Sequence, residues 1–420
     1  MGKQKQDNLV LTVDKRENTM SPIIWRNIGS YTHFLNCING EIISIEANSV
    51  ETKRILDSPA NYEFDHDAKI VFYNTKGQYN SRLCRKNLIK LGLRFNFPTM
   101  VNIELSRRCS LRCVHCYVGD KNLSSSKPSF LEQLSECDVN GLFDELKSLG
   151  VFLVVITGGE PFISKSFKTF LEIGAQKGFL MEIFSNLQYL PDWFCSSRYK
   201  DFRIGRIQTS VYSSEKKIHD SVTKSIGSFE QNIKNLYFLK EKGYFLEVAT
   251  PLMRKNFFSW ENTSFFFRKI GIVQNFSWPL AYEYYGLNKR RKGELNISGQ
   301  NFRDFVGKNP DFLLKINNAN PDEYICEAGK AIFAISATGD IFPCSQLPLS
   351  VGNIKRNKIK EIIRGKRMVK IASLKWKDIR AKKVFNFCLG INYTDAGNVL
   401  TQPEYMLNAI NVVFAKKERR

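Results

Sequence analysis

Beyond Val101 the chain alternates between short runs rich in β-branched and aromatic residues and longer stretches with the spacing of an amphipathic helix. A repeated order of strand and helix predicts a mostly parallel sheet covered by helices. Four of the helical stretches end in glycine, which commonly ends a helix and turns the chain into the next strand. Six such units predict an α/β fold, a partial (β/α)6 barrel whose active site lies at the C-terminal ends of its strands. The strand-like runs are "VNIEL" (101–105), "VFLVVITGG" (151–159), "FLMEIFSN" (179–186), "RIQTSVYS" (206–213), "YFLEVATPL" (244–252) and "IVQNFSWPL" (272–280).

The segment before the barrel predicts a small module of its own. Residues 33–47 alternate well enough for a hairpin, and Asn39-Gly40 is a type I′ turn signal. Residues 49–58 and 79–93 have the apolar spacing of helices. Strands followed by helices predict a winged-helix-like domain.

The segment after the barrel begins with a polar and basic connection and contains a second hairpin pattern. Residues 331–344 predict two strands that flank Thr338, Gly339 and Asp340. We expect this hairpin to form a separate small domain. The predicted division of the chain is 1–97, 98–285 and 286–420.

Composition limits the location and the partners. The N-terminal stretch 1–20 contains no apolar run long enough for a signal peptide, and no run in the 420 residues is long enough for a membrane span, so we expect a cytoplasmic protein. Ten cysteines in such a chain are more typical of reduced metal or redox ligands than of disulfides. The net charge of +21 suits nucleic acid, an anionic membrane surface or an acidic partner, and an ordinary solvated surface also accounts for it. Nucleic acid is the less favoured partner, because no RNA-binding motif is present.

Three cysteines lie within eight positions directly after the first barrel strand, with the spacing Cys109-x3-Cys113-x2-Cys116. Thiolates this close can converge on one metal centre. Structural zinc would need a closed set of four ligands with His115 as the fourth, and a packing role would need more apolar neighbours. An iron–sulfur cube held by three cysteines leaves one iron open to a small chelating molecule. We therefore expect a [4Fe–4S] cluster here.

The spacing of these cysteines and their place after a strand resemble the cluster motif of the radical S-adenosylmethionine (SAM) superfamily. In that family the methionyl group of SAM chelates the fourth iron, and the residue at the position of His115 lies against the adenine. The second strand ends in "GGEP", which resembles the family's turn that receives the methionine amino group. Glycines permit a close backbone approach, and a carboxylate offsets an ammonium. The resemblance implies SAM contacts here from Gly158, Gly159, Glu160 and Pro161.

Two later strand ends also resemble cofactor contacts of the family. "FSNLQ" (184–188) resembles a Ser/Thr-Asn-Gly ribose site, with Leu187 in the place of glycine. The stretch after the fourth strand resembles another family pattern, with Lys224 in the place of the usual arginine. The further contacts that the resemblance implies are Ser185, Asn186 and Ser210.

A second set of cysteines lies in the C-terminal segment. Twelve residues separate Cys326 from Gly339, and four more separate Gly339 from Cys344. This spacing resembles the opening of the SPASM/twitch extension, which binds auxiliary iron–sulfur clusters. The extension normally supplies several further cysteines close together, whereas this chain supplies Cys388. The resemblance implies an auxiliary cluster on these three thiols. The remaining cysteines are expected to be packing residues, namely Cys37, Cys84, Cys137 and Cys195.

The order of the three parts resembles the thioether-forming peptide maturases, the group that includes the sporulation killing factor maturase. The N-terminal module resembles a domain that grips a leader peptide by strand addition. The resemblance implies an enzyme that takes an electron from a flavodoxin or ferredoxin, generates a 5′-deoxyadenosyl radical and removes hydrogen from a ribosomally made precursor peptide. A Cys S–C thioether crosslink, as in sactipeptides, is the expected product. Peptide epimerisation, C–C crosslinking, sulfatase maturation and tRNA modification stay open as alternatives.

Overall fold

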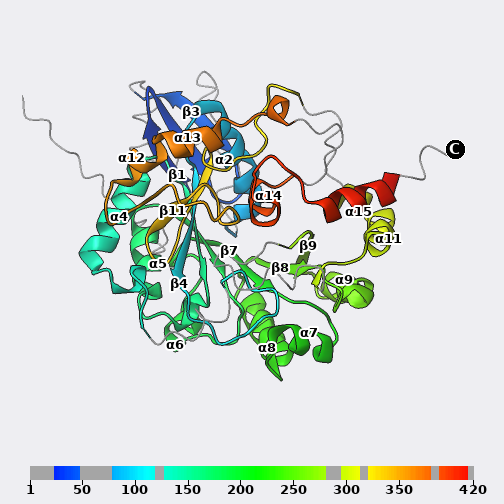
Figure 1. The fold of residues 1–420 in the computed structure, drawn as a ribbon. Helices are drawn as coiled ribbons and strands as arrows, with labels where there is room; N and C mark the ends of the chain where they lie inside the picture. The colour runs from blue at the N-terminus through cyan, green and yellow to red at the C-terminus, as the bar shows by residue number, and fades with distance from the viewer. Residues whose placement is uncertain are drawn as a thin grey trace, which may run out of the picture.

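A computed structural model describes residues 23–47, 78–118, 127–280, 295–312, 320–379 and 387–414 (Figure 1). The six predicted barrel strands are confirmed and are neighbours in chain order, each parallel to the next. They are β4 (Met100–Ser106), β5 (Leu153–Gly158), β6 (Leu180–Phe184), β7 (Ile204–Ser210), β8 (Leu246–Pro251) and β9 (Val273–Ser277).

Four long helices pack against one face of this sheet and form with it the largest hydrophobic cluster. They are α4 (Glu136–Ser148), α5 (Phe167–Gln176), α8 (Ser228–Glu241) and α9 (Trp260–Lys269). After each helix a glycine adopts a φ between 65° and 97°, a conformation that costs glycine little, so the predicted helix ends are confirmed. These glycines are Gly150, Gly178, Gly243 and Gly271.

Shorter elements connect the barrel strands and helices. They are α6 (Asp192–Cys195), α7 (Lys216–Thr223) and the 3-10 helices Leu131–Gln133, Pro161–Ile163 and Phe257–Ser259. Two further 3-10 helices, Pro310–Phe312 and Trp376–Asp378, lie in the C-terminal segment. In the part of the chain that the structure describes, no helix has the length and apolar character to span a bilayer.

The other face of the sheet carries a buried network of charges. Arg206 of β7 donates to Glu182 of β6 at 2.6 Å and to Glu247 of β8 at 2.7 Å, and Arg85 approaches Glu182 at 3.0 Å. Burial opposes the ionisation of Glu182, but Arg206 and Arg85 hold its pKa below the ordinary value. Loss of one partner would leave a buried charge uncompensated.

The N-terminal module begins with a three-stranded antiparallel sheet of order β1-β2-β3. The strands are β1 (Ile23–Ile28), β2 (Tyr31–Asn36) and β3 (Ile42–Glu46). The predicted hairpin is confirmed, but its connection covers residues 37–41 with Gly40 alone at positive φ, so the two-residue type I′ turn is wrong. The sequence pattern does not indicate β1, and the expected helix at 49–58 lies outside the described residues.

The N-terminal module packs against the N-terminal ends of the barrel strands. Leu88 of α2 (Ser81–Phe95) shares a hydrophobic cluster with Met100 and Leu153. Arg26 of β1 donates to the carbonyl oxygens of Val151 at 2.6 Å and of Gly178 at 2.9 Å. These buried contacts make β1 and α2 part of the barrel's own packing.

The C-terminal segment extends the barrel sheet. Its strands are β10 (Ile332–Ile335), β11 (Asp340–Phe342) and β12 (Gly352–Asn353). The predicted hairpin is confirmed by β10 and β11, with Gly339 at a φ of 84°. We expected a separate small domain, but β10 pairs in parallel with β4, and the full order is β12-β11-β10-β4-β5-β6-β7-β8-β9.

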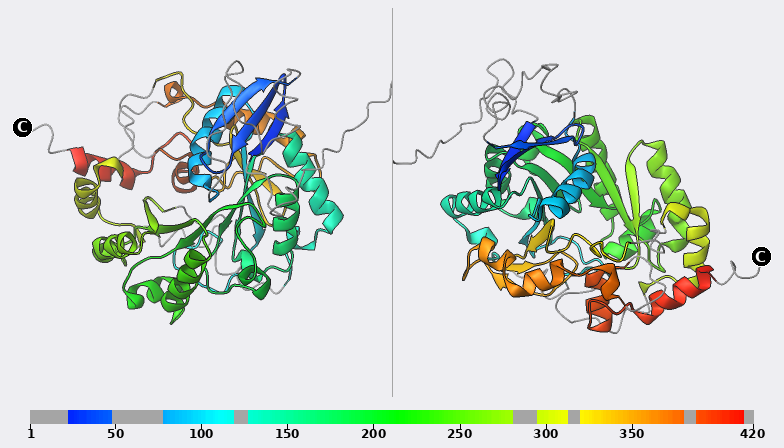
Figure 2. Two further views of the ribbon diagram at one scale, coloured as in Figure 1. Left: turned by 180° about the vertical axis from the view of Figure 1, so that it is seen from behind. Right: turned by 90° about the horizontal axis from the view of Figure 1, so that it is seen from above.

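Helices follow this hairpin. They are α12 (Ile359–Ile363), α13 (Lys366–Ala372), α14 (Leu389–Ala396) and α15 (Glu404–Phe414), the last packed on α11 (Gly299–Lys308). In Figure 2 the blue N-terminal sheet and the red helix α15 lie at well-separated parts of the molecule.

The cysteines outside the two sets differ in burial. Cys37 and Cys84 are buried, as expected of packing residues, and Cys195 is partly buried. The expectation for Cys137 is wrong, because its side chain is exposed. α4 turns Val139 and its helical neighbours toward the core, and Cys137, two positions earlier, lies on the solvent side.

Candidate functional site

The first three cysteines lie on a loop that leaves the C-terminal end of β4, where this kind of fold places its active site. The loop backbone is tied to the end of α7. Arg112 N–H donates to the Thr223 carbonyl oxygen at 3.0 Å, and Val114 N–H donates to the Val222 carbonyl oxygen at 2.9 Å. The loop is therefore held by a strand at one end and by a helix terminus along its length.

Two glycines at the end of β5 bring the next turn into backbone contact with this loop. A Cβ on Gly158, whose φ is 124°, would lie 2.2 Å from the Ser106 carbonyl oxygen, and one on Gly159 would lie 2.0 Å from that of Arg108. Gly159 N–H donates to the Ser106 carbonyl oxygen at 2.6 Å, and Glu160 N–H donates to the Arg108 carbonyl oxygen at 2.7 Å. The glycines thus permit a close approach, and the group they approach is the cysteine loop.

Glu160 is fully buried, and its carboxylate links the ends of β5 and β6. It accepts hydrogen bonds from the Ser185 hydroxyl at 2.8 Å, from Asn186 N–H at 2.7 Å and from Phe162 N–H at 3.1 Å. Burial raises its pKa to about 7, although these hydrogen bonds act in the opposite direction. Three of the predicted contact residues therefore form one hydrogen-bonded group, and Pro161 begins the short helix beside it.

Polar side chains donate hydrogen bonds to two thiols of the loop. Asn186 Nδ2 donates to Cys109 Sγ at 3.4 Å, and the Tyr212 hydroxyl donates to Cys113 Sγ at 3.7 Å. Burial raises the pKa of Cys109 to about 11 and that of Cys113 to about 12, and repulsion from Cys116 adds to both shifts. The thiols are close enough to repel one another as thiolates, so an electropositive centre would be needed to hold all three in that form.

His115 lies between two of these cysteines, with its ring edge-on to Tyr212 at a centroid distance of 5.0 Å. Its Nδ1 is buried without a hydrogen-bond partner in the described structure, and burial lowers its pKa to about 4, so the ring is neutral. Ser210, at the end of β7, hydrogen-bonds the same tyrosine. Across the described residues, no three His, Cys, Asp or Glu side chains are arranged to hold a single metal ion. A buried ring nitrogen without a partner suits contact with a polar cofactor.

The turn after β6 tolerates leucine at a strained position. Leu187 has a φ of 54°, the left-handed conformation that glycine adopts easily. Two asparagines of α8 hold this turn: Asn235 Nδ2 donates to the Leu187 carbonyl oxygen at 2.8 Å, and Asn232 Nδ2 donates to that of Asn186 at 2.9 Å. The hydrogen bonds from α8 therefore stabilise the left-handed backbone at Leu187, which a glycine would adopt without such support.

Lys224 is not part of this group. It is exposed and ends α7 at a φ of 59°. Nearby, Asp220 accepts hydrogen bonds from Gly227 N–H and the Ser228 hydroxyl, both at 2.8 Å, and so fixes the start of α8. The stretch that resembles the family pattern is structural at these two positions.

The three C-terminal cysteines come together at a second place. Burial raises the pKa of Cys344 to about 12, repulsion from Cys388 adds to that shift, and both neighbours act on Cys326 in the same direction. Each thiol accepts a hydrogen bond from backbone N–H groups, and Cys388 does so at the start of α14. Gly390 permits this arrangement, because a Cβ there would lie 2.1 Å from the Gln346 carbonyl oxygen. Backbone donors to sulfur are a common means of tuning iron–sulfur clusters.

Both cysteine sets adjoin the same face of β4. Asn102 Nδ2 donates to the hydroxyl of Ser345, the residue after the second cysteine of the C-terminal set, at 3.0 Å. Glu104 accepts from Tyr117, the residue after the last cysteine of the loop, and burial raises the pKa of Glu104 to about 7. Side chains two positions apart on a strand share a face and lie roughly 7 Å apart. The two sets therefore flank one stretch of the sheet.

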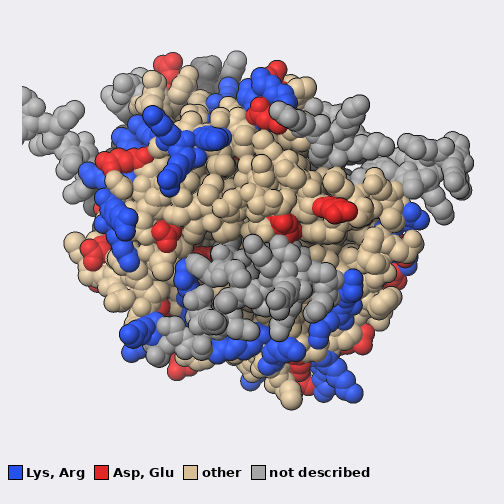
Figure 3. Space-filling view, viewed as in Figure 1, with Lys and Arg blue, Asp and Glu red and all other residues tan. Residues whose placement is uncertain are grey.

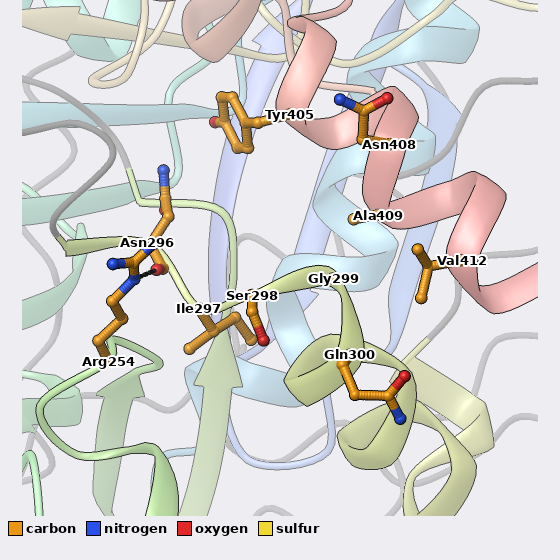
Figure 4. Close-up of a pocket in the computed structure, with 10 residues that line it drawn as sticks. All are labelled: Arg254, Asn296, Ile297, Ser298, Gly299, Gln300, Tyr405, Asn408, Ala409 and Val412. Atoms are coloured by element: carbon orange, nitrogen blue, oxygen red, sulfur yellow. Dashed lines mark hydrogen bonds between the residues drawn. The ribbon is translucent and has the colours of Figure 1, made fainter.

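A pocket of about 370 Å³ lies between α11 and α15 (Figure 4). Arg254, which follows β8, donates to the Asn296 carbonyl oxygen at 2.8 Å. The Ser298 hydroxyl accepts from Asn301 N–H at 3.1 Å and caps α11. These polar groups bond to one another, and none of the predicted site residues lines this pocket.

Tyr212 and Asn256 are parts of the site that the sequence motifs do not indicate. Asn256 Nδ2 donates to the Tyr212 carbonyl oxygen at 2.9 Å, and Tyr212 N–H donates to His219 Nδ1 at 3.3 Å. Tyr212 comes two residues after Ser210, so the rule that site residues follow the C-terminal ends of barrel strands could have found it.

Two family models match the chain. Residues 103–263 match the Radical SAM superfamily, and residues 326–389 match SPASM, an iron–sulfur cluster-binding domain. An AdoMet-dependent heme synthase of Methanosarcina barkeri is 22% identical over 293 residues, which cover 64% of this chain and 82% of the synthase. The subtilosin biosynthesis protein AlbA of Bacillus subtilis is 26% identical over 294 residues, which cover 66% of this chain and 62% of AlbA, less than two thirds of its length. The structure of Streptococcus suis SuiB bound to precursor peptide SuiA matches with a TM-score of 0.57 at 16% identity, over 85% of this chain and 90% of SuiB.

The chain is a radical SAM enzyme with a C-terminal SPASM domain. Its cofactors are accordingly SAM and a [4Fe–4S] cluster, with auxiliary iron–sulfur binding in the SPASM domain. The residues present fit these groups, because each place offers three cysteines that form no disulfide, and hydrogen-bond donors point at sulfur in both places.

Replacement of Gly159 by alanine tests the contact between the turn and the loop. The added Cβ would meet the Arg108 carbonyl oxygen at 2.0 Å, so the backbone must shift and its hydrogen bonds must lengthen. We expect a loss of about 2 kcal/mol or more in unfolding free energy and a lower iron content after reconstitution. Thermal unfolding and iron analysis measure these effects. Gly141→Ala in α4, where a Cβ meets nothing within 4 Å, should be neutral or stabilising, and an equal loss in both variants would contradict the assignment.

Replacement of Tyr212 by phenylalanine tests the hydrogen bond to Cys113. The variant keeps the ring against His115 and removes only the hydroxyl donor. Donors to ligating sulfur favour the reduced cluster, so its midpoint potential should fall by about 40 mV, the equivalent of about 1 kcal/mol for one electron. An electron paramagnetic resonance titration measures this potential. Tyr244→Phe, which loses a hydroxyl bonded to the Ser197 carbonyl oxygen, is the control and should leave it unchanged.

Proposed function

We propose that the chain is a maturase that forms a Cys S–C thioether in a ribosomally made precursor peptide. In this proposal the loop thiols hold the radical cluster and the C-terminal thiols hold the auxiliary cluster. With SAM bound, the radical cluster would supply a 5′-deoxyadenosyl radical at the mouth of the barrel. The radical cluster set is Cys109, Cys113 and Cys116, and the auxiliary set is Cys326, Cys344 and Cys388. The proposed SAM contacts are His115, Gly158, Gly159, Glu160, Pro161, Ser185, Asn186 and Ser210.

The observation that carries this proposal is the placement of both cysteine sets beside one face of β4. Asn102 contacts the neighbour of one set, and Glu104 contacts the neighbour of the other. A peptide that lies across this face could present a carbon to one set and a cysteine thiol to the other. Three protein thiolates on the auxiliary cluster would leave a position for that substrate thiolate.

The residues around the barrel mouth would position the reactants and exclude water. Glu160 and Asn186 hold the end of β6 against the cysteine loop, and the neutral His115 ring offers a nitrogen to a polar group. At the opposite end, α2 and the ion pairs of Arg206 fill the inner face of the sheet. Cofactor chemistry of this kind depends on the protein for orientation and for exclusion of competing reactions.

Two of the relatives favour a peptide substrate, and a third favours a second candidate function. AlbA is a bacteriocin biosynthesis protein, and SuiB binds a precursor peptide. The heme synthase of Methanosarcina barkeri matches over 82% of its own length, so heme synthesis is the second candidate. Incubation with an iron porphyrin precursor and with a cysteine-containing precursor peptide, each analysed by mass spectrometry, separates the two.

Alanine at Cys326, Cys344 or Cys388 should leave the release of 5′-deoxyadenosine largely intact but stop the crosslink. Alanine at a loop cysteine should abolish both, because a radical cluster needs all three thiolates. Chromatography measures 5′-deoxyadenosine, and mass spectrometry measures the peptide. The intact enzyme should give a product lighter by two hydrogen atoms, one lost from sulfur and one from carbon.

Two outcomes would contradict the thioether proposal. A product of unchanged mass that gains one deuterium in heavy water would indicate epimerisation. A product lighter by two hydrogens in which every cysteine still reacts with iodoacetamide would indicate C–C crosslinking. Modification of transfer RNA or of a sulfatase in place of the peptide would show that the substrate is not a precursor peptide.

The N-terminal sheet has an edge that suits a leader peptide. Asn36 N–H donates to the Glu41 carbonyl oxygen, and Ala47 N–H donates to that of Ser30, each at 2.9 Å. Because alternate residues of an antiparallel strand face its partner, positions 42, 44 and 46 direct their backbone N–H and C=O groups away from β2. Among the described residues β3 pairs with β2 alone. These groups support strand addition by an extended peptide.

Ser44→Pro tests this edge without removing a hydrogen bond between β2 and β3. Proline removes one outward N–H, so the affinity for the precursor should fall about tenfold, as measured by fluorescence anisotropy. Ser44→Ala is the matched control, since it loses the same hydroxyl, which lies 2.8 Å from His33 Nδ1, and should bind like the native enzyme. Equal affinity of both variants would remove this edge from leader binding. Deletion of the module is a poorer test, because Arg26 and α2 pack on the barrel.

A further inference from the structure

A dense basic surface covers the two short helices that follow the auxiliary hairpin. Residues 355–370 include eight basic residues and one acidic residue. All eight basic side chains are exposed, and none takes part in an ion pair among the described residues. Blue side chains gather over α12 and α13 at the upper left of Figure 3. This α12–α13 patch consists of Lys355, Arg356, Lys358, Lys360, Arg364, Lys366, Arg367 and Lys370.

A hollow of about 770 Å³ adjoins the patch. Lys360 and Arg364 of the patch line it together with Lys330, and Val369 contributes an apolar side chain that is 50% exposed. An exposed apolar residue among charges of one sign is the composition of a docking surface for a protein of opposite charge.

The buried side of α13 contacts the loop of the auxiliary cysteines. Ile371 lies in the same hydrophobic cluster as Cys326 and Cys344. Met368 packs so closely on Gly329 that a Cβ there would lie 2.8 Å from the methionine sulfur. One helix, roughly 10 Å across, therefore separates the exposed patch from the auxiliary thiols.

We propose that the α12–α13 patch docks a small acidic electron-transfer protein that delivers one electron to the auxiliary cluster. The inference rests on the proposed function, in which Cys326, Cys344 and Cys388 hold that cluster. With a flavodoxin as donor, the flavin hydroquinone is oxidised to the semiquinone and the auxiliary cluster is reduced by one electron, and no covalent bond between the proteins forms or breaks. Nucleic acid fits the patch less well, because residues 355–372 include no aromatic side chain on which a base could stack.

The test uses the reconstituted full-length enzyme and an acidic flavodoxin in its hydroquinone form. Stopped-flow absorbance follows the reduction of the enzyme's clusters, and titration calorimetry with the oxidised flavodoxin follows binding. At low salt, the triple variant K366E/R367E/K370E should bind the flavodoxin more weakly, and the flavodoxin should reduce it more slowly by a factor of about ten or more. The rate of this reduction should no longer fall as the ionic strength rises. The neutral variant K366Q/R367Q/K370Q should show a smaller change in the same direction.

The matched control is K217E/K234E/R268E, which makes the same charge change at exposed positions on α7, α8 and α9. The control should be reduced like the native enzyme, and dithionite should reduce every variant equally. Native rates of reduction in both patch variants, or equal slowing in the control, would overturn the proposal. Patch variants that lose RNA binding but still bind the flavodoxin like the native enzyme would also overturn it. Absence of SAM cleavage with dithionite would count against the proposed function, and the flavodoxin titration would still test the patch.

Discussion

The backbone contact between the double glycine of β5 and the cysteine loop is the constraint on which the rest of the site depends. It removes the space that any side chain would need at Gly159, and it places Glu160 N–H on the Arg108 carbonyl oxygen. The Glu160 carboxylate then binds the backbone of Asn186, whose side chain returns to Cys109. Three strand ends are thereby joined in a closed circuit of hydrogen bonds. A change in one member must displace the others, because interior packing leaves little slack.

The inner face of the barrel explains why the chemistry is confined to one end. At the N-terminal ends of the strands this face is covered by α2, and its middle is filled by Arg206 between Glu182 and Glu247. Such a network needs every partner, since an unpaired buried charge costs more than the pair gains. The polar residues on this face therefore form a rigid, filled layer. The two cysteine sets lie beyond this layer, where their neighbouring residues contact Asn102 and Glu104 of the sheet.

The barrel could be predicted from local patterns because each unit carries its own signals. Apolar runs set the strands, and glycines such as Gly150 and Gly178 set the helix ends. The pairing of β10 with β4 could not be predicted, because a hairpin pattern gives the partner within the hairpin but not the sheet that it joins. Motifs indicated Cys109, Glu160 and Asn186, yet not the contacts between them. The strand-end rule could have indicated Tyr212 but not its contact with Cys113, because the hydroxyl reaches a thiol 99 residues away in the chain.

The two cysteine sets differ in the share of side-chain donors among their hydrogen bonds, and this difference bears on their roles. In the loop, Leu111 N–H donates to Cys109 Sγ at 3.4 Å, and the side chains of Asn186 and Tyr212 also donate to two of the thiols. In the C-terminal set, backbone N–H groups predominate, and Cys388 lies at the start of α14, where the helix dipole favours a thiolate. A thiolate set stabilised by fixed dipoles can accept charge without rearrangement. Because this set lies between the buried side of α13 and one face of β4, it could take up an electron from a docked donor on one side or from a substrate on the other.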